Sequence, residues 1–137
     1  MTKLVLLLGA SMLVFAGVAF AASPVMVGTK LDAMQDHATS SHGKGSFTAT
    51  ASHGKLKFTL KFSGLTGAAS AAHIHLGAKG KAGPVIIPLC GPCKSPVTGT
   101  VAVTASVLKK IEAGKTYVNV HTAKYPNGEI RGQLAKG

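Results

Sequence analysis

The sequence predicts an all-β fold, an antiparallel β-sandwich or barrel of about seven to eight strands with one short helix. Three observations predict it: strict polar–apolar alternation over residues 55–62, frequent turn signals, and a helical pattern in one segment only. Of the 137 residues, 116 remain beyond a predicted N-terminal signal of 21. That length suits one domain with one core, and no internal repeat or linker divides it.

The expected strands follow one another with short turns between them. Residues 55–62 read Lys-Leu-Lys-Phe-Thr-Leu-Lys-Phe, which buries one face, and His53-Gly54 joins them to the preceding strand as a hairpin. Pro88 cannot donate a ladder hydrogen bond, so its strand should lie at a sheet edge or end there. The predicted strands are 45–51, 55–62, 71–76, 85–89, 99–104, 115–122 and 129–134.

Two segments differ from this pattern. Residues 106–113 predict the helix, with Ser106 able to cap its start and Gly114 able to close its end. Residues 22–44 are rich in Ser, Gly, Ala and His and form either a flexible arm or a first strand. The domain proper is predicted to cover residues 45–137.

The first 21 residues have the pattern of a secretory signal peptide. Lys3 precedes an apolar run, and small residues end that run, with cleavage expected after Ala21. The alternative is an uncleaved membrane anchor, since about 20 apolar residues can span a bilayer. With cleavage, we expect a secreted or periplasmic protein that has no membrane span.

The net charge of the chain is +11, and it is +10 without the signal, which holds Lys3 and no acid. Such a charge attracts polyanions, although the lysines are dispersed along the sequence and only Lys109 and Lys110 are adjacent. We therefore expect weak polyanion binding or simple solubility, and no specific nucleic-acid partner.

Catalytic chemistry finds little support in the sequence. Four acidic residues in all argue against paired-carboxylate catalysis. The glycine-rich segment 77–83 lacks the Gly-Lys-Ser/Thr ending of a phosphate-binding loop. We predict no catalytic residues and no enzymatic activity.

Three histidines are candidate metal ligands: His73, His75 and His121. Residues two apart on a strand point the same way, so an inward Ile74 turns His73 and His75 outward together. Inward Val118 and Val120 likewise turn His121 outward. If the two strands are neighbours, the three imidazoles share one patch that suits copper or zinc. The alternative is a set of ordinary polar residues on an exposed or loop-covered face.

The segment Cys90-Gly91-Pro92-Cys93 copies the thioredoxin tetrapeptide without its context. Pro96 follows closely and opposes the helix that a thioredoxin motif needs. We expect a disulfide between Cys90 and Cys93 in an oxidising compartment. Both sulfurs joining a soft-metal site with nearby histidines is the alternative, and His53 is a further candidate ligand.

Several stretches between Gly45 and Leu134 resemble the CHRD family, a domain named for chordin that also occurs in exported bacterial proteins. The resemblance implies an extracytoplasmic immunoglobulin-like, Greek-key sandwich, and it supplies no catalytic residues. The resembling stretches are residues 62–65, 72–77, 83–85, 114–122 and 125–134.

The segment His73-Ile74-His75 is also similar to the copper-binding strand of copper/zinc superoxide dismutases. A bridging histidine and a zinc-site aspartate are not found, because Asp32 and Asp36 lie outside the resembling region. The similarity therefore points to a single copper or zinc site and not to a dismutase. In the final hairpin, Glu129 and Arg131 share the outward face, where they can pair.

Three classes of function follow from these observations. The first is an exported binding or structural module with an unknown protein, cell-surface or polysaccharide partner. The second is a copper- or zinc-binding protein that uses His73, His75 and His121. The third is a basic polyanion binder.

Overall fold

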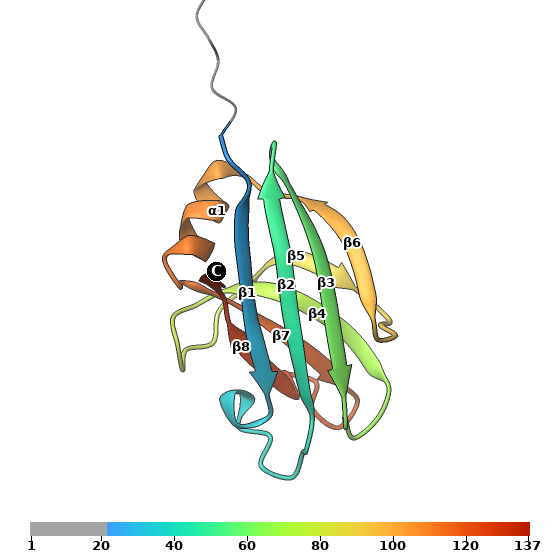
Figure 1. Cartoon of the computed structure of the whole chain (residues 1–137). Coiled ribbons are helices and arrows are strands. Elements are labelled where there is room, and N and C mark those ends of the chain that lie inside the picture. Colours follow the sequence, from blue (N-terminus) through green and yellow to red (C-terminus); the bar gives the residue numbers. More distant parts are fainter. Residues whose placement is uncertain (1–21) are drawn as a thin grey trace, which may run out of the picture.

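The computed structural model describes residues 22–137, so the predicted signal peptide lies outside the described residues. The described chain is almost entirely β-structure with one α-helix (Figure 1), which confirms the predicted all-β class. All predicted strands are present, with bounds shifted by at most two residues. The strands are β1 (Val25–Asp32), β2 (Lys44–Ser52), β3 (Lys55–Ser63), β4 (Ala69–Leu76), β5 (Val85–Cys90), β6 (Val97–Ala102), β7 (Thr116–Thr122), β8 (Ile130–Gln133) and β9 (Ala135–Lys136), and the helices are η1 (Met34–Asp36) and α1 (Ala105–Glu112).

The strands form one continuous antiparallel sheet that folds over on itself. Their order is β5-β4-β7-β8-β1-β2-β3-β6, with β9 paired to β1. The fold-over lies between β8 and β1, where Asp32 and Arg131 are the pair in register. In Figure 1, β1, β2 and β3 lie in front of β4, β5, β7 and β8. We call β1-β2-β3-β6 the front layer and β5-β4-β7-β8 the back layer.

The core lies between the two layers and follows the alternation of the sequence. In β3, Leu56 and Leu60 are 0 % exposed, and the strand's three lysines, at 55, 57 and 61, are exposed. Phe58 of β3 stacks on Phe47 of β2, with ring centroids 5.8 Å apart. The back layer contributes Ile74, and burial of each such side chain contributes about 1.5–3 kcal/mol. A core of this kind fixes which side chains each layer presents outward.

Residues 22–44 hold the first strand and not only an arm. Strand β1 pairs with β2 along its whole length, from Val25 opposite Ala51 to Asp32 opposite Lys44. Val27 and Leu31 of this strand are buried in the core. The folded unit therefore begins upstream of residue 45, where the sequence pattern first becomes regular.

The α-helix begins one residue earlier than predicted and has a different cap. Thr104, not Ser106, provides the N-cap, because its Oγ1 accepts a hydrogen bond of 3.2 Å from the Val107 amide. Gly114 follows the helix end with a φ of 68°, the left-handed conformation that glycine adopts without strain. Ile111 is 0 % exposed and attaches the helix to the core.

Two local predictions about the strands are confirmed. His53 and Gly54 form the β2–β3 turn with φ angles of 50° and 71°, as a two-residue hairpin turn of this hand requires. Strand β5, which contains Pro88, lies at one end of the strand order, so its proline removes no hydrogen bond from the middle of the sheet.

Candidate metal centre

The back layer places the three predicted ligand residues side by side. Strands β4 and β7 are antiparallel neighbours, with His73 opposite Asn119 and His75 opposite Tyr117. Ile74 between the first two histidines is 0 % exposed in the core. His73, His75 and His121 therefore project from the outer face of the back layer, the side that alternation predicts.

That outer face is covered and not open to solvent. Every residue of β7 is buried, and His75 and His121 are only 8 % and 9 % exposed. Loop carbonyl groups cover them: Gly83 of the β4–β5 loop lies on His75, and Pro126 of the β7–β8 loop lies on His121. The three histidines thus share the outward patch that alternation predicts, and loops cover that patch.

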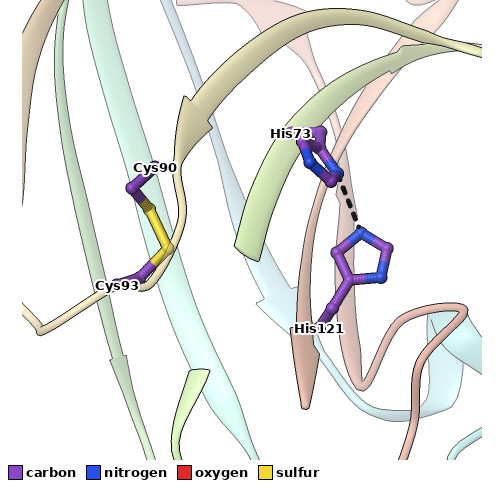
Figure 2. The surroundings of a disulfide bond; sticks show 4 residues. All are labelled: His73, Cys90, Cys93 and His121. Carbon is purple, nitrogen blue, oxygen red and sulfur yellow. Dashed lines mark hydrogen bonds between the residues drawn. A yellow bond between two sulfur atoms is a disulfide. The ribbon is translucent and has the colours of Figure 1, made fainter. Parts of the chain in front are cut away.

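The three imidazoles form a compact cluster. The Nδ1 atom of His73 lies 3.0 Å from Nε2 of His121, as Figure 2 shows. The ring centroid of His75 lies 5.6 Å from that of His73 and 6.0 Å from that of His121. One nitrogen from each ring can be chosen so that all three lie within 4.8 Å of one another. His73 is half-buried and is the most accessible member.

Backbone carbonyl groups determine the tautomers of two of these rings. The Nδ1 of His75 is 2.8 Å from the Gly83 carbonyl oxygen, and the Nδ1 of His121 is 2.9 Å from that of Pro126. A carbonyl oxygen only accepts, so each Nδ1 carries the proton and each Nε2 keeps its lone pair. The Nε2 of His75 is buried and has no hydrogen-bond partner among the described residues. The Nε2 atoms of His75 and His121 are therefore the atoms that would bind a metal.

Burial also favours the neutral forms of His73 and His121. Desolvation lowers the pKa of His73 below 6.5, and the nearby His121 and His75 lower it further. Desolvation likewise lowers the pKa of His121, with His75 adding to the effect, while the hydrogen bond to Pro126 and the charge of Asp36 oppose it. Neutral imidazoles are the form that binds metals.

Tyr117 packs against the cluster through its contact with His75. Its ring stacks on His75 with an interplanar angle of 9° and a centroid distance of 4.8 Å. The Arg131 guanidinium lies 3.4 Å from the Tyr117 ring centroid. The Tyr117 hydroxyl accepts a 3.0 Å hydrogen bond from the Gly83 amide, and the Gly83 carbonyl holds His75. Tyr117 therefore positions His75 both directly and through the loop.

Asp36 lies near this cluster, although the sequence places it in the N-terminal arm. It follows β1 in η1, and its Oδ2 is buried and has no hydrogen-bond partner among the described residues. Burial raises the pKa of this carboxyl above 3.8, against the opposing charges of Arg131, His121 and His75 and a hydrogen bond from Asn119. No local motif marks it, because the fold brings it to the site from a distant part of the sequence.

The predicted pairing of Glu129 with Arg131 is absent. Glu129 is 0 % exposed, and its carboxylate accepts hydrogen bonds from Ser41, Thr122 and both the amide and hydroxyl of Thr66, at 2.6–2.8 Å. Desolvation would raise its pKa, but these hydrogen bonds together lower it below 4.5. Arg131 instead donates to the Ala78 carbonyl and to Gln133. Ser41, Thr66 and Ala78 among these partners lie in loops, whose position the alternation pattern cannot reveal.

The other candidate ligands are not part of the cluster. Cys90 and Cys93 form a disulfide with an S–S distance of 2.06 Å, so neither offers a free thiolate (Figure 2). His53 lies in the β2–β3 turn, where its Nδ1 is 2.7 Å from the Ser52 hydroxyl. Within residues 22–137, the grouping of three or more possible ligands consists of the three histidines alone.

Comparison with protein families identifies a domain of known type in this chain. The model of the CHRD domain matches residues 27–134, a range that includes most of β1 and Asp36 and so begins earlier than the resembling stretches. Comparisons with curated proteins and with solved structures find no match. Within residues 22–137, no helix has the length and apolar character needed to cross a membrane.

CHRD domains are typically extracellular and are not known as enzymes. At the level of the family, the match supports a binding or structural module. Because the match covers most of the chain, from β1 through β8, the protein belongs to the CHRD family.

Proposed function

We propose that this protein is an exported, non-enzymatic CHRD module that binds one copper or zinc ion through His73, His75 and His121. The observation that carries the proposal is the convergence of three imidazoles, two of which are oriented by carbonyl groups that hold the proton on Nδ1 and leave Nε2 unprotonated. Such outer hydrogen bonds are typical of histidines that bind metals, since they fix the tautomer and the ring orientation.

The spacing of the ligand atoms is compatible with one ion. Nitrogen atoms that bind zinc at about 2.0–2.1 Å in tetrahedral geometry lie about 3.4 Å apart. The ligand atoms of the cluster lie within 4.8 Å of one another, so small rotations of the rings bring them to that spacing. The 3.0 Å separation between His73 and His121 already approaches it.

The donor set narrows the choice of metal. Three neutral imidazoles suit copper and zinc, whereas magnesium and calcium require oxygen ligands. Three protein ligands also leave a coordination position for water or another small ligand. An ion or small ligand enters from the side of His73, because it is the half-buried member of the cluster.

Export is the second part of the proposal. The signal-peptide pattern of residues 1–21 supports it, as does the extracellular setting typical of CHRD domains. The Cys90–Cys93 disulfide fits an oxidising compartment such as the periplasm or the medium.

The test is a titration of tag-free residues 22–137 with copper(II) and with zinc(II), measured by calorimetry against a chelator of known affinity. We expect one ion per chain at micromolar strength or better. His73→Ala, His75→Ala and His121→Ala should each weaken binding at least about tenfold, because each removes one of three ligands.

The matched control is His42→Ala, which removes an exposed histidine outside the cluster and should leave the affinity unchanged. Absence of binding in the unmodified protein would overturn the metal assignment. Equal weakening by the control would also overturn it, since binding would then reflect scattered surface histidines.

A further inference from the structure

The outer face of the front layer gathers lysines that are dispersed in the sequence. Strand β3 alternates, so its lysines at 55, 57 and 61 all point away from the core and are exposed. Strands β1 and β2 contribute one exposed lysine each on the same side. This basic face, as we call it, carries Lys30, Lys44, Lys55, Lys57 and Lys61.

Strand register interleaves these lysines with hydroxyl groups. Ser46 of β2 is opposite both Lys30 of β1 and Lys61 of β3. Two outward rows further along, Lys57 of β3 is opposite Thr50 on one side and Thr100 on the other. Outward side chains on one strand are about 7 Å apart, and neighbouring strands are about 4.8 Å apart. Ammonium and hydroxyl groups therefore lie beside one another across neighbouring strands of this surface.

A row of threonines crosses the middle of the basic face. Thr48, Thr59 and Thr98 are successive partners across β2, β3 and β6. Two hollows of about 510 and 540 Å³ lie on the face. The lining of the first includes threonine hydroxyls, Lys57 and Met26, and that of the second includes Lys30, Lys44, Lys61 and Phe62. The face thus offers both cationic and neutral hydrogen-bonding groups in shallow depressions.

Negative charge is almost excluded from this surface. Glu129 and Asp36 belong to the loop-covered network of the back layer, and Glu112 lies 3.5 Å from Lys136 beside the helix. Asp32 is the acid that borders the second hollow, and its carboxylate accepts two hydrogen bonds from Gln35. The five lysines therefore lack acidic partners across the middle of the face. The anionic groups of a polymer could take the place of those partners.

The side chains on this face favour one class of polyanion. Phe47 and Phe58 are buried in the core, and Phe62 at the border of the second hollow is only partly exposed, so the middle of the face offers no exposed aromatic ring on which nucleic-acid bases could stack. Met26 is its exposed large apolar side chain, which gives little area for membrane insertion. Hydroxyl groups beside ammonium groups match a polymer that carries both hydroxyl and anionic groups.

We propose that the basic face binds an anionic polysaccharide, with lysines 30, 44, 55, 57 and 61 contacting its carboxylate or sulfate groups and the Ser and Thr hydroxyls contacting its sugar hydroxyls. The face lies on the front layer and the histidine cluster lies on the outer side of the back layer, so this site is independent of metal binding. The protein would be held at a polymer surface while its histidine site remains accessible.

The experiment measures retention of EDTA-treated residues 22–137 on immobilised heparin, which is sulfated, and on polygalacturonate, which is carboxylated, with uncharged dextran as the blank. The test variant is Lys55→Gln/Lys57→Gln/Lys61→Gln. The matched control is Lys109→Gln/Lys110→Gln/Lys124→Gln, which removes the same charge from the helix and the β7–β8 loop. Circular dichroism verifies that both variants remain folded.

We expect salt-sensitive binding to at least one of the two polymers, weakened about tenfold or more at 50 mM salt by the face variant and less than about threefold by the control. Retention on heparin alone would identify sulfate groups, and retention on both would identify the shared anionic chemistry. Equal losses in both variants would overturn the proposal in favour of net charge alone.

Two further outcomes would also overturn the polysaccharide assignment. One is tighter binding to duplex DNA or to anionic phosphatidylglycerol vesicles than to either polymer, with the same dependence on the face lysines. The other is no retention of the unmodified protein at 50 mM salt. Because the assay uses metal-free protein, its result does not depend on the metal proposal.

Discussion

The Nδ1 atom of His73 and the Nε2 atom of His121 face each other at 3.0 Å, from neighbouring strands that are 48 residues apart in sequence. The Nδ1 proton of His121 is engaged with the Pro126 carbonyl, so its Nε2 accepts. In the metal-free protein, His73 therefore donates its Nδ1 proton to His121. An ion that enters between the rings replaces this hydrogen bond, and the His73 proton moves to its Nε2, so that Nδ1 is free and the ring stays neutral. Binding then weakens at low pH, because protonated imidazoles cannot bind the ion.

We predict that His73 and His121 both titrate below 6.5 in the metal-free protein, because burial disfavours their charged forms. Lowered pKa values mean that the unfolded chain binds more protons in this range, so stability falls as pH drops below about 6.5. Imidazole NMR signals followed from pH 8 to pH 4 would measure the pKa values. His121→Asn should raise the pKa of His73 part of the way back, and values at or above 6.5 would contradict the prediction.

Tyr117→Phe should weaken metal binding without removing a ligand. The change keeps the ring stacked on His75 but deletes the hydroxyl that accepts from the Gly83 amide, and the Gly83 carbonyl holds Nδ1 of His75. Loss of such a supporting group typically lowers metal affinity about 10–100-fold. Calorimetric titration measures the effect. Tyr125→Phe, on the β7–β8 loop, is the control, and equal affinities in the two variants would show that the Gly83 contact is irrelevant to the site.

The sequence predicts much of the fold because the relevant signals are local. Alternation over Lys55 to Phe62 assigns a strand and its buried face, and it needs no information about neighbours. The same logic correctly places His73 and His121 on the outer side of their strands. It cannot show that β4 and β7 are neighbours, because that pairing depends on the whole topology.

The features that sequence-based prediction missed arise from contacts between distant segments. Asp36 reaches the histidine cluster because η1 follows β1, and β1 adjoins β8 at the fold-over. The basic face combines lysines from three strands, although only Lys109 and Lys110 are adjacent in the sequence. Glu129 was expected on an open face, but loops from Ser41 and Thr66 cover it. Such coverage leaves no periodic signal in the strand itself.

Glu129→Ala should be strongly destabilising. Removing the buried carboxylate leaves the Ser41 and Thr122 hydroxyls and the Thr66 amide without their acceptor, and each unsatisfied buried group costs about 1–3 kcal/mol. We expect a loss of about 3 kcal/mol or more in the free energy of unfolding, measured by urea titration at pH 7. Glu112→Ala, which breaks the surface contact with Lys136, should cost less than about 1 kcal/mol.

The contribution of Glu129 should also depend on pH in one direction. Its pKa is lower in the folded protein than the ordinary 4.5, so the stabilisation is present above 4.5 and is lost as pH falls through the folded pKa. Urea titrations at pH 7 and pH 3 should therefore show a smaller difference between Glu129→Ala and the unmodified protein at pH 3. An equal difference at both pH values would mean that the carboxylate charge contributes nothing.

Gly128→Ala tests the contact between the β7–β8 loop and Asp36. A Cβ atom at this position would overlap the Asp36 carboxylate and lie 2.7 Å from Nδ2 of Asn119, and the φ of 129° disfavours any side chain. Two residues earlier, the Pro126 carbonyl holds His121, so displacement of the loop reaches the cluster. We expect a loss of about 1–3 kcal/mol in unfolding free energy and a weaker affinity for the metal.

Gly67→Ala is the matched control for that variant, since a Cβ atom there meets nothing within 4 Å. It should change stability by less than about 0.5 kcal/mol and leave metal affinity unaltered. If Gly128→Ala lost stability but bound metal as tightly as Gly67→Ala, the loop would support the fold without positioning His121. If both variants were equally stable, the close packing of Asp36 on Gly128 would itself be contradicted.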